Sequence, residues 1–354
     1  MPYPAHFVVP GSLDQRTGGY RYNARVIRGL TERGWLIGVH ELPGDTWPML
    51  SRPDRAECGR ILDTLPDESL IVIDGLALSG LLETLPALTA RARVMALVHC
   101  PLFRETGLSP ALSARFRDEE TQALALVQRV VATSAWAGGD VVRSFGVPRG
   151  RLGVVEPGVD PAPASTGSDG RRLLCVASLT QRKGQLVLLD ALSRLMDVPW
   201  ELDLVGSPER DPGYAARVRA AVRKHGMEER VALKGELGGA ALEAAYEEAD
   251  VFVLPSWYET YGMVLTEALA RGLPVVTTTA GAIPGTVPEA ARLAVEPGDV
   301  DALSDALKRI LTDHHLRGRL AGAAAALRDS LPGWDEPTRG FARELSMLQR
   351  EEAR

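Results

Sequence analysis

Short apolar runs alternate along almost the whole chain with segments in which apolar residues recur at helical spacing. The apolar runs predict strands at residues 6–9, 36–40, 70–75, 94–99 and 130–133, and then at 173–177, 201–206, 231–235, 251–255 and 274–278. Helical spacing predicts helices at residues 20–33, 121–129, 184–194, 214–225, 240–248, 263–271, 300–311, 316–327 and 334–354. Because parallel strands need crossover connections, usually helices, this alternation predicts an α/β protein with parallel sheets.

The alternation is interrupted once, by a stretch of small and polar residues rich in proline and glycine from Asp160 to Gly170. Such a composition is typical of a linker. We therefore predict an N-terminal Rossmann-like domain at 1–162, a linker at 163–170, a second Rossmann-like domain at 171–330, and a last helix at 331–354 that packs back on the first domain. Ligands of doubly wound sheets bind at the carboxyl ends of the strands, so we expect two domains that face each other across a ligand-binding cleft.

Composition narrows the class of protein. The 354 residues are 45% hydrophobic and 24% charged, which suits two globular domains and excludes a disordered chain. The net charge of −6 gives no basic footprint for nucleic acid. Cys58, Cys100 and Cys175 form no Cys-x-x-Cys pair, which argues against a disulfide framework or a zinc site and favours a reducing, cytoplasmic location. No signal peptide and no apolar run of about 20 residues is evident.

The segment from Pro255 to Gly272 is the densest in candidate chemistry. A buried strand ends, a polar and aromatic turn follows, and a helix begins near Gly262. A helix start offers unpaired N–H groups that suit phosphate, and glycine lets a ligand approach the backbone closely. The carboxylates of Glu259 and Glu267 suit the vicinal hydroxyls of a sugar or a ribose. The plainer interpretation makes Glu259 a helix cap and Glu267 a solvated residue.

This segment resembles the Glu-x7-Glu signature of the retaining glycosyltransferases of family 4, which have the GT-B fold. Thr260 and Tyr261 depart from the Gly-Phe that is usual there. The residues that match the family pattern are Ser256, Glu259, Gly262, Val264, Glu267, Ala268, Gly272, Pro274 and Val275.

Four further segments extend the resemblance. Thr17-Gly18-Gly19-Tyr20 is similar to the glycine loop before the family's first helix, and His99 stands where the family has a strand-ending histidine. Residues 177–184 resemble a phosphate-binding turn in which Lys183 reaches the donor phosphates. Ser178 replaces the customary arginine, so either Arg182 compensates or phosphate contact rests on Lys183 and the backbone. Residues 234–237 align with the loop that recognises the nucleotide base.

The resemblance implies a metal-independent enzyme that transfers a sugar from a nucleoside-diphosphate sugar, UDP-linked on family frequency, with retention of configuration. It implies catalytic roles for His99, Glu259 and Lys183, with Glu259 on the sugar hydroxyls and Glu267 on the ribose. Tyr20, Arg21 and Tyr22 are candidates for contact with the acceptor, although they equally suit a half-buried helix face. The implied donor-binding residues are Gly18, Gly19, Ser178, Arg182, Lys183, Glu236, Leu237, Glu259, Tyr261, Gly262, Met263, Val264 and Glu267.

Several alternatives stay open. Asp299-Val300-Asp301 spells a metal motif, but it opens a predicted helix, so we expect two capping acids and no required metal or other cofactor. The chain is short for the family, which favours the hydroxyl of a small-molecule or lipid acceptor. Arg115 and Arg117 could touch a membrane surface, although a solvated charged helix is the simpler interpretation. The oligomeric state is open.

Other activities fit less well. A GT-B nucleotide-sugar epimerase would need a different acid–base set, and a dinucleotide-dependent dehydrogenase would need a Gly-x-Gly-x-x-Gly after the first strand. A non-catalytic nucleotide-sugar-binding protein of the same fold is supported only by Ser178.

Overall fold

The structure, a computed structural model, describes residues 4–44 and 47–351. The chain divides into two compact units, one formed by Met1–Gly158 with Pro332–Arg354 and the other by Val159–Leu331. We call them unit 1 and unit 2 and describe each by itself.

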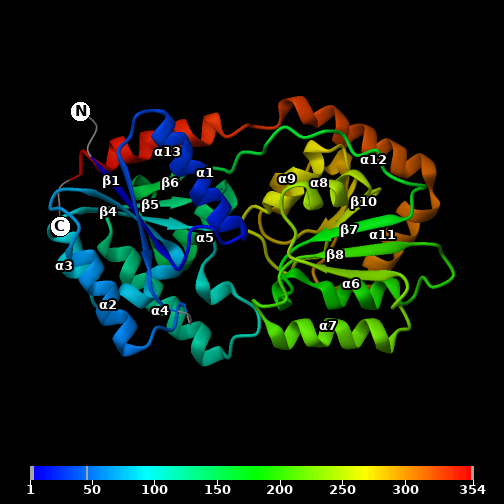
Figure 1. Ribbon diagram of the computed structural model, residues 1–354, viewed down its shortest axis with the longest axis horizontal. Coiled ribbons are helices and arrows are strands. Elements are labelled where there is room, and N and C mark those ends of the chain that lie inside the picture. The colour runs from blue at the N-terminus through cyan, green and yellow to red at the C-terminus, as the bar shows by residue number, and fades with distance from the viewer. Residues whose placement is uncertain (1–3, 45–46, 352–354) are drawn as a thin grey trace. The chain divides into compact units, whose positions relative to one another are not determined.

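Unit 1 is built on a six-stranded parallel sheet with the strand order β2-β1-β3-β4-β5-β6. Figure 1 shows α1 and α13 on one side of this sheet and α2, α3 and α4 on the other. The strands are β1 (Ala5–Pro10), β2 (Ile37–Leu42), β3 (Leu70–Asp74), β4 (Arg93–Val98), β5 (Arg129–Ala132) and β6 (Leu152–Val154). The helices are α1 (Gly18–Glu32), α2 (Arg52–Asp63), α3 (Leu85–Thr89), α4 (Pro110–Leu126), α5 (Ala135–Phe145) and α13 (Asp335–Leu348).

The last helix of the chain belongs to unit 1. The ring of Phe341 on α13 stacks on Phe7 of β1 at a centroid distance of 5.6 Å, and both side chains are buried. The guanidinium of Arg129 on β5 donates to the Glu344 carboxylate at 2.5 Å. Helix α13 thus packs on β1 through an apolar contact and on β5 through an ion pair.

Unit 2 repeats the same architecture with the strand order β12-β11-β10-β7-β8-β9. Figure 1 shows α6 and α7 on one side of the sheet and α8 and α9 on the other. The strands are β7 (Arg172–Val176), β8 (Glu201–Val205), β9 (Val231–Gly235), β10 (Val251–Leu254), β11 (Val275–Thr278) and β12 (Arg292–Val295). The helices are α6 (Gln185–Leu192), α7 (Pro212–Lys224), α8 (Ala240–Glu247), α9 (Met263–Ala270), α10 (Ile283–Thr286), α11 (Val300–Thr312) and α12 (His314–Leu327).

All pairings in both sheets are parallel, as the alternating pattern predicts. The α/β class with two doubly wound domains is therefore confirmed. Strands β7 and β10 are sequence-distant neighbours at the centre of the unit 2 sheet, with Val251 opposite Leu173 and Phe252 opposite Leu174. The reversal of strand order at this point is where doubly wound sheets place their ligands.

The boundary between the units differs from the sequence-based prediction. Unit 1 ends at Gly158 rather than at residue 162. The predicted linker is not free: the backbone N–H of Ser165 donates to Arg271 O at 2.8 Å, and that of Thr166 donates to Glu247 O at 3.0 Å. The polar residues of this stretch thus satisfy carbonyl groups at the ends of α8 and α9, which holds the segment along unit 2.

Some predicted elements have other limits. Helix α4 begins at Pro110, well before the predicted residue 121, with the Ser109 hydroxyl as its cap. Helix α13 ends at Leu348 instead of continuing to residue 354, and residues 352–354 lie outside the described residues. Strands β6 and β12 and helices α2 and α5 were not predicted. Within the described parts of the chain, none of the helices has the length and apolar character needed to span a membrane.

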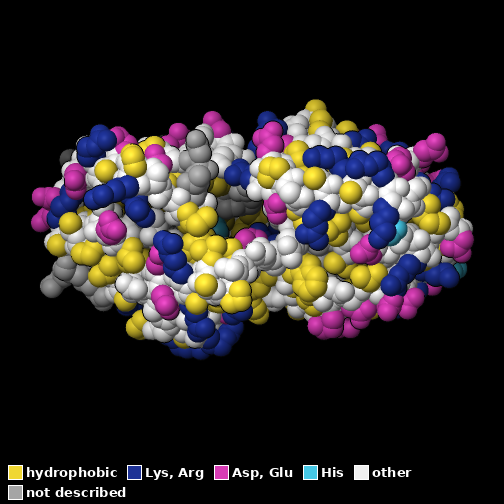
Figure 2. All heavy atoms as spheres, turned by 90° about the horizontal axis from the view of Figure 1, so that it is seen from below, with side chains coloured by type: hydrophobic (Ala, Val, Ile, Leu, Met, Phe, Trp, Pro, Cys, Tyr) yellow, Lys and Arg dark blue, Asp and Glu magenta, His cyan; other side chains and the backbone are white. Residues whose placement is uncertain are grey.

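The surface mixes charges. Figure 2 shows basic and acidic side chains interspersed over each unit on the face in view. Arg115 and Arg117, which were weighed as membrane contacts, bond within unit 1. The Arg115 guanidinium pairs with Glu119 at 2.7 Å, and Arg117 lies 5.6 Å from the ring centroid of Phe103. These contacts agree with the simpler interpretation of a charged helix surface.

Candidate functional site

Two loops at the carboxyl ends of β7 and β10 bring the main sequence candidates of unit 2 together. The first loop carries Lys183 at the end of a single 3₁₀ turn, Gln181–Lys183, and the second carries Glu259. The Lys183 ammonium lies 2.5 Å from Glu259 Oε1. The sequence predicts that both residues line the donor site, and the structure adds that they form an ion pair with each other.

Backbone contacts hold these two loops against each other. The N–H of Trp257 donates to the carbonyl of Arg182 at 2.8 Å, and the Arg182 guanidinium donates to the carbonyl of Tyr258 at 3.1 Å. Gly184 follows with φ of +72°, and a Cβ there would lie 2.1 Å from the carbonyl oxygen of Pro255. Only glycine fits this conformation and this close approach, so Gly184 determines how near Lys183 comes to Glu259.

The Glu259 carboxylate is 5% exposed and has several partners. Its Oε1 also accepts from the Ser256 hydroxyl at 2.7 Å, and its Oε2 lies 3.7 Å from the Arg182 guanidinium. Burial acts to raise the pKa of Glu259, but the charges of Lys183 and Arg182 and the two hydrogen bonds outweigh it, so this pKa lies below its ordinary value. The side chain is therefore an anion at neutral pH and a strong acceptor.

Glu267 lies in the same helix–loop segment but at another depth. It is on α9, 7% exposed, and its Oε2 accepts from the hydroxyl of Tyr246 on α8 at 3.1 Å. The interpretation of Glu267 as a solvated helix residue is therefore wrong. Helix α9 begins immediately after Gly262, whose φ is +88°, and no side chain caps its first turn. A carboxylate, a helix N-terminus and a lysine thus lie in adjoining segments, which suits a ligand with both hydroxyl groups and phosphates.

The other candidates of unit 2 differ in exposure. The Ser178 carbonyl accepts from the Gln185 side chain at 3.0 Å, so this residue helps to close the turn before Lys183. Tyr261 is buried and its carbonyl accepts from Thr286 at 2.7 Å. After β9, Glu236 is exposed and Leu237 is half-buried, and on α9 Met263 and Val264 are half-buried.

Unit 1 gathers a second cluster around His99, which follows β4. A Cβ on Gly19, at the start of α1, would lie 3.1 Å from the imidazole ring, so the glycine loop and His99 are in contact. Gly18, beside it, is exposed. The Asn23 side chain connects His99 to Asp74: its Oδ1 lies 2.8 Å from His99 Nε2, and its Nδ2 lies 2.6 Å from Asp74 Oδ2.

This arrangement assigns the proton of the imidazole. A carboxylate only accepts hydrogen bonds, so the side-chain NH2 group of Asn23 must face Asp74. The side-chain oxygen of Asn23 must then face His99. His99 therefore donates from Nε2. Burial lowers the pKa of His99, and the Asp74 charge opposes that effect without reversing it. Sequence reasoning missed Asn23 and Asp74; the one available signal was an acid at the end of an apolar strand.

The aromatic candidates for acceptor contact are buried. Tyr22 is fully buried, and its hydroxyl donates to the Val155 carbonyl at 3.0 Å. Tyr20 is 6% exposed, and its hydroxyl donates to the Pro10 carbonyl. Arg21 is half-buried. The geometry of the two tyrosines favours the interpretation of a buried helix face over acceptor contact.

Asp299 and Asp301 act at the start of α11, as the sequence predicts. Asp299 is the N-cap residue and its Oδ1 accepts from the N–H of Ala302 at 2.9 Å, while Asp301 pairs with Arg194. Among the described residues, no group of three or more His, Cys, Asp or Glu side chains is placed to hold a metal ion.

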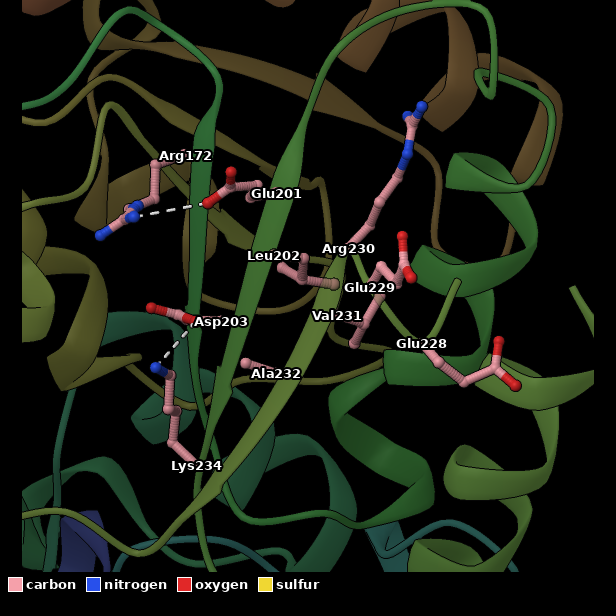
Figure 3. A pocket seen from close by; sticks show the side chains of 10 residues that line it. All are labelled: Arg172, Glu201, Leu202, Asp203, Glu228, Glu229, Arg230, Val231, Ala232 and Lys234. Carbon is pink, nitrogen blue, oxygen red and sulfur yellow. Dashed lines mark hydrogen bonds and ion pairs between the residues drawn. The ribbon is translucent and has the colours of Figure 1, made fainter. Parts of the chain in front are cut away.

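Two cavities lie elsewhere. One of about 180 Å³ lies along β7, β8 and β9, where Arg172 pairs with Glu201 and Lys234 with Asp203 (Figure 3). The other, of about 330 Å³ in unit 1, is bordered by Leu50 and Phe116. Lys234, from the segment aligned with the base-recognition loop, lines the first cavity, and Arg115 lines the second, but neither cavity is lined by His99, Lys183, Glu259 or Glu267. Four of the charged side chains of the first form these two ion pairs, and we assign the cavity no ligand.

Comparisons with known proteins find similar chains that are named glycosyltransferases. The family described as glycosyl transferases group 1 matches residues 170–313. The chain is 32% identical over 239 residues to a D-inositol 3-phosphate glycosyltransferase of Xylanimonas cellulosilytica, which covers 61% of this chain and 56% of the relative. It is 28% identical over 239 residues to a mannosylfructose-phosphate synthase of Agrobacterium fabrum, covering 62% and 52%. The chain thus spans about half the length of the curated relatives that it matches.

Solved structures share the fold over nearly the full chain. A sucrose-phosphate synthase from Thermosynechococcus elongatus aligns with a TM-score of 0.79 at 20% identity, covering 98% of this chain and 99% of that one. The Anabaena protein Alr3699/HepE in complex with UDP-glucose aligns with a TM-score of 0.77 at 18% identity, covering 97% and 99%. At this identity the likeness concerns the fold, and it confirms the GT-B class.

Proposed function

We propose that this chain, whose residues 170–313 match the family described as glycosyl transferases group 1, transfers a sugar from a nucleoside-diphosphate sugar to a hydroxyl acceptor. The observation that carries the proposal is the Lys183–Glu259 pair, joined at 2.5 Å beside the start of α9 and followed eight residues later by buried Glu267. The names of the matched relatives, a glycosyltransferase and a synthase of a glycosylated phosphate, support the same reaction class.

The reaction breaks the bond between the anomeric carbon of the sugar and the diphosphate. Negative charge then grows on the departing diphosphate, and positive charge grows on the sugar ring. A fixed ammonium and the N-terminus of a helix stabilise the first, because they are already oriented where the charge develops. In this proposal Lys183 and the first turn of α9 perform this task, with Arg182 adding positive charge.

The carboxylates bind the hydroxyl-bearing parts of the donor. We assign the sugar hydroxyls to Glu259, whose lowered pKa keeps it an acceptor, and the ribose diol to Glu267. Because Lys183 already contacts Glu259, the donor would share the pair: phosphate oxygens on the ammonium and sugar hydroxyls on the carboxylate. In unit 1 we assign His99 the orientation of the sugar or of developing charge, as the resemblance implies.

The finer assignments follow the resemblance. We propose a UDP-linked donor, retention of configuration by attack on the same face with the leaving phosphate accepting the acceptor's proton, a small-molecule or lipid acceptor, and no required metal. The solved complex of Alr3699/HepE contains UDP-glucose, which makes UDP the first nucleotide to test.

Thermal unfolding against UDP, GDP, ADP and their sugars tests the donor site, since a ligand that binds only the folded state raises the melting temperature. We expect nucleotides of one base to raise the melting temperature of the wild type. Lys183→Ala should need at least tenfold more of that nucleotide for the same rise. Lys308→Ala, which replaces an exposed lysine on α11, should respond like the wild type. No rise with any nucleotide, or an unaltered response in Lys183→Ala, would overturn the donor-site assignment.

Release of sugar from the bound donor separates the enzyme from a non-catalytic binding protein. We expect slow hydrolysis of the selected nucleotide sugar by the wild type, its loss in Glu259→Ala, and a folded Glu259→Ala protein by circular dichroism. Binding of the donor without hydrolysis or transfer to any screened acceptor would instead favour the non-catalytic alternative that Ser178 suggests.

A further inference from the structure

Tyr246 and Glu267 form a buried hydroxyl–carboxylate contact that the proposed reaction does not by itself require. Tyr246 is fully buried on α8, and its hydroxyl lies 3.1 Å from Glu267 Oε2 on α9. A phenol donates one hydrogen bond, and an ionised carboxylate only accepts. The hydroxyl therefore fixes the orientation of the Glu267 carboxylate from the interior side.

The ring that carries this hydroxyl is itself in contact with two further side chains. It stacks with Phe252 of β10 at a centroid distance of 6.0 Å and an angle of 14°. The guanidinium carbon of Arg271 lies 4.1 Å from the ring centroid. A cation and an aromatic ring packed against the phenol restrict its movement.

Arg271 is held in turn through both terminal nitrogens of its guanidinium group. One terminal nitrogen donates to the two oxygens of Glu243 at 2.7 and 2.6 Å, and the other donates to the backbone carbonyl of Glu267 at 2.9 Å. Its side chain is 8% exposed, whereas that of Glu243 is 52% exposed. The same arginine thus clamps the tyrosine ring and the helix turn that carries Glu267.

We propose that Tyr246 is a positioning residue for nucleotide recognition: packed against Phe252 and Arg271, it orients the Glu267 carboxylate toward the ribose diol and so makes the site select ribonucleotides over deoxyribonucleotides. The inference rests on the proposed function, in which Glu267 accepts from the ribose hydroxyls. A carboxylate that can rotate loses the directional part of these hydrogen bonds, whereas the phosphates are bound elsewhere in the site. The preference for ribose should fall while phosphate binding is retained.

The test measures dissociation constants by calorimetry for the ribo and 2′-deoxy forms of UDP, ADP and GDP, using the full chain. The ratio of the two constants for the base that binds is the readout. We expect the wild type to prefer the ribo form by about tenfold or more, and Tyr246→Phe to reduce this preference by about threefold to tenfold, as for a lost hydrogen bond to a charged group. Glu267→Gln should reduce it as well, and the double variant should add little, because the two residues act as one unit.

The matched control is Tyr214→Phe. Tyr214 is also buried in unit 2, and its hydroxyl accepts from the N–H of Leu186 at 3.0 Å, so the substitution removes a comparable hydrogen bond away from Glu267. A merely structural role for Tyr246 predicts that both phenylalanine variants lower the melting temperature and that neither changes the ribose preference. That result would overturn the inference.

The outcomes separate the inference from the function beneath it. If Glu267→Gln loses the ribose preference and Tyr246→Phe keeps it, the inference is overturned and the donor site stands. If no nucleotide binds the wild type, or Glu267→Gln keeps the preference, the ribose assignment of the proposed function is overturned, and the inference with it. Should Tyr246→Phe not fold, Glu243→Ala replaces it in the test, because it removes the carboxylate that holds the Arg271 guanidinium against the Tyr246 ring. An unaltered ribose preference in that variant also overturns the inference.

Discussion

Burial destabilises the charged form of the Glu259 carboxylate, and the neighbouring cations Lys183 and Arg182 stabilise it. With 5% of its surface exposed, it has lost most of its hydration, and it keeps its charge because Lys183, Ser256 and Arg182 replace the lost water. Removing one partner of such a pair leaves the other charge buried, which costs far more than the net value of the pair. The donor-binding residues are therefore also a determinant of stability in unit 2.

Lys183→Ala should consequently lower the free energy of unfolding, by roughly 3 kcal/mol at pH 7. In the wild type the pKa of Glu259 is lowered, so its contribution is present above pH of about 4.5 and is lost as pH falls through the folded-state pKa. Without Lys183 the burial effect remains and the pKa of Glu259 rises. The difference between wild type and variant in urea unfolding should therefore be largest at pH 7 and shrink toward pH 4.

The second substitution that checks this explanation is Glu259→Gln in the Lys183→Ala background. Glutamine removes the charge and keeps an oxygen for the Ser256 hydroxyl, so the double variant should be more stable than Lys183→Ala alone. A double variant that is less stable than the single one would show that the lysine stabilises unit 2 through its packing rather than through the ion pair.

At this scale the sequence identifies candidate residues more readily than their contacts. Glu259 and Glu267 were singled out at a predicted helix start, and Lys183 through the resemblance of residues 177–184 to a family motif. The partners Tyr246, Asn23 and Asp74 lie on other elements, and no spacing connects them to the residues that they contact. The sequence left Tyr22 between acceptor contact and a half-buried helix face for the same reason: the carbonyl that accepts from its hydroxyl lies 133 residues away.

The two loops after β7 and β10 form one unit at the scale of elements. Their strands are neighbours in the sheet, and the Arg182–Trp257 backbone hydrogen bond continues that pairing beyond the strand ends. Gly184 permits this close approach of the two loops, because a Cβ at residue 184 would collide with the carbonyl oxygen of Pro255. A substitution at this glycine should therefore act on the site and on the fold together.

Gly184→Ala and Gly226→Ala separate steric collision from backbone strain. Both glycines have positive φ, +72° and +64°, but a Cβ on Gly226 meets nothing within 4 Å, whereas one on Gly184 would lie 2.1 Å from Pro255 O. Gly226→Ala should lower the free energy of unfolding by only about 1 kcal/mol, the cost of the left-handed conformation. Gly184→Ala should cost at least twice as much and also weaken nucleotide binding, as measured by urea unfolding and calorimetry. Equal costs would contradict the close approach.

Helices and strands were predicted where burial produces a regular apolar pattern. The central strands β3, β4, β7 and β10 are short apolar runs, since both of their faces are covered. The elements that were missed have weak patterns for a physical reason. Strands β6 and β12 have three and four residues at sheet edges, and α2 buries only Cys58, Gly59 and Leu62 out of twelve positions. The N-cap residue of α2 is Ser51, and serine is too common a residue to predict a helix start by itself.

At the scale of the whole molecule, each unit has a core of its own and the chain returns to the first one at its end. The apolar cluster of unit 2 is formed entirely within residues 173–324, and that on one face of the unit 1 sheet within residues 8–147. The opposite face of β1 is covered by α13, through Phe341. The sequence predicted a last helix that packs back on the first domain, but only the structure shows which strand it covers.

Phe341→Ala and Phe252→Ala test this division, because the two phenylalanines are equally buried in different units. Each truncation should lower the stability of its own unit by about 3–5 kcal/mol, through lost apolar contact and the cavity that remains. We expect Phe341→Ala to reduce hydrogen-exchange protection of amides in β1, β3 and α1 and to leave β7 and β10 as protected as in the wild type. Phe252→Ala should give the reverse pattern. If Phe341→Ala reduced protection in unit 2 and not in unit 1, α13 would not be part of the unit 1 core, and the last 23 residues would have to be assigned to the other unit.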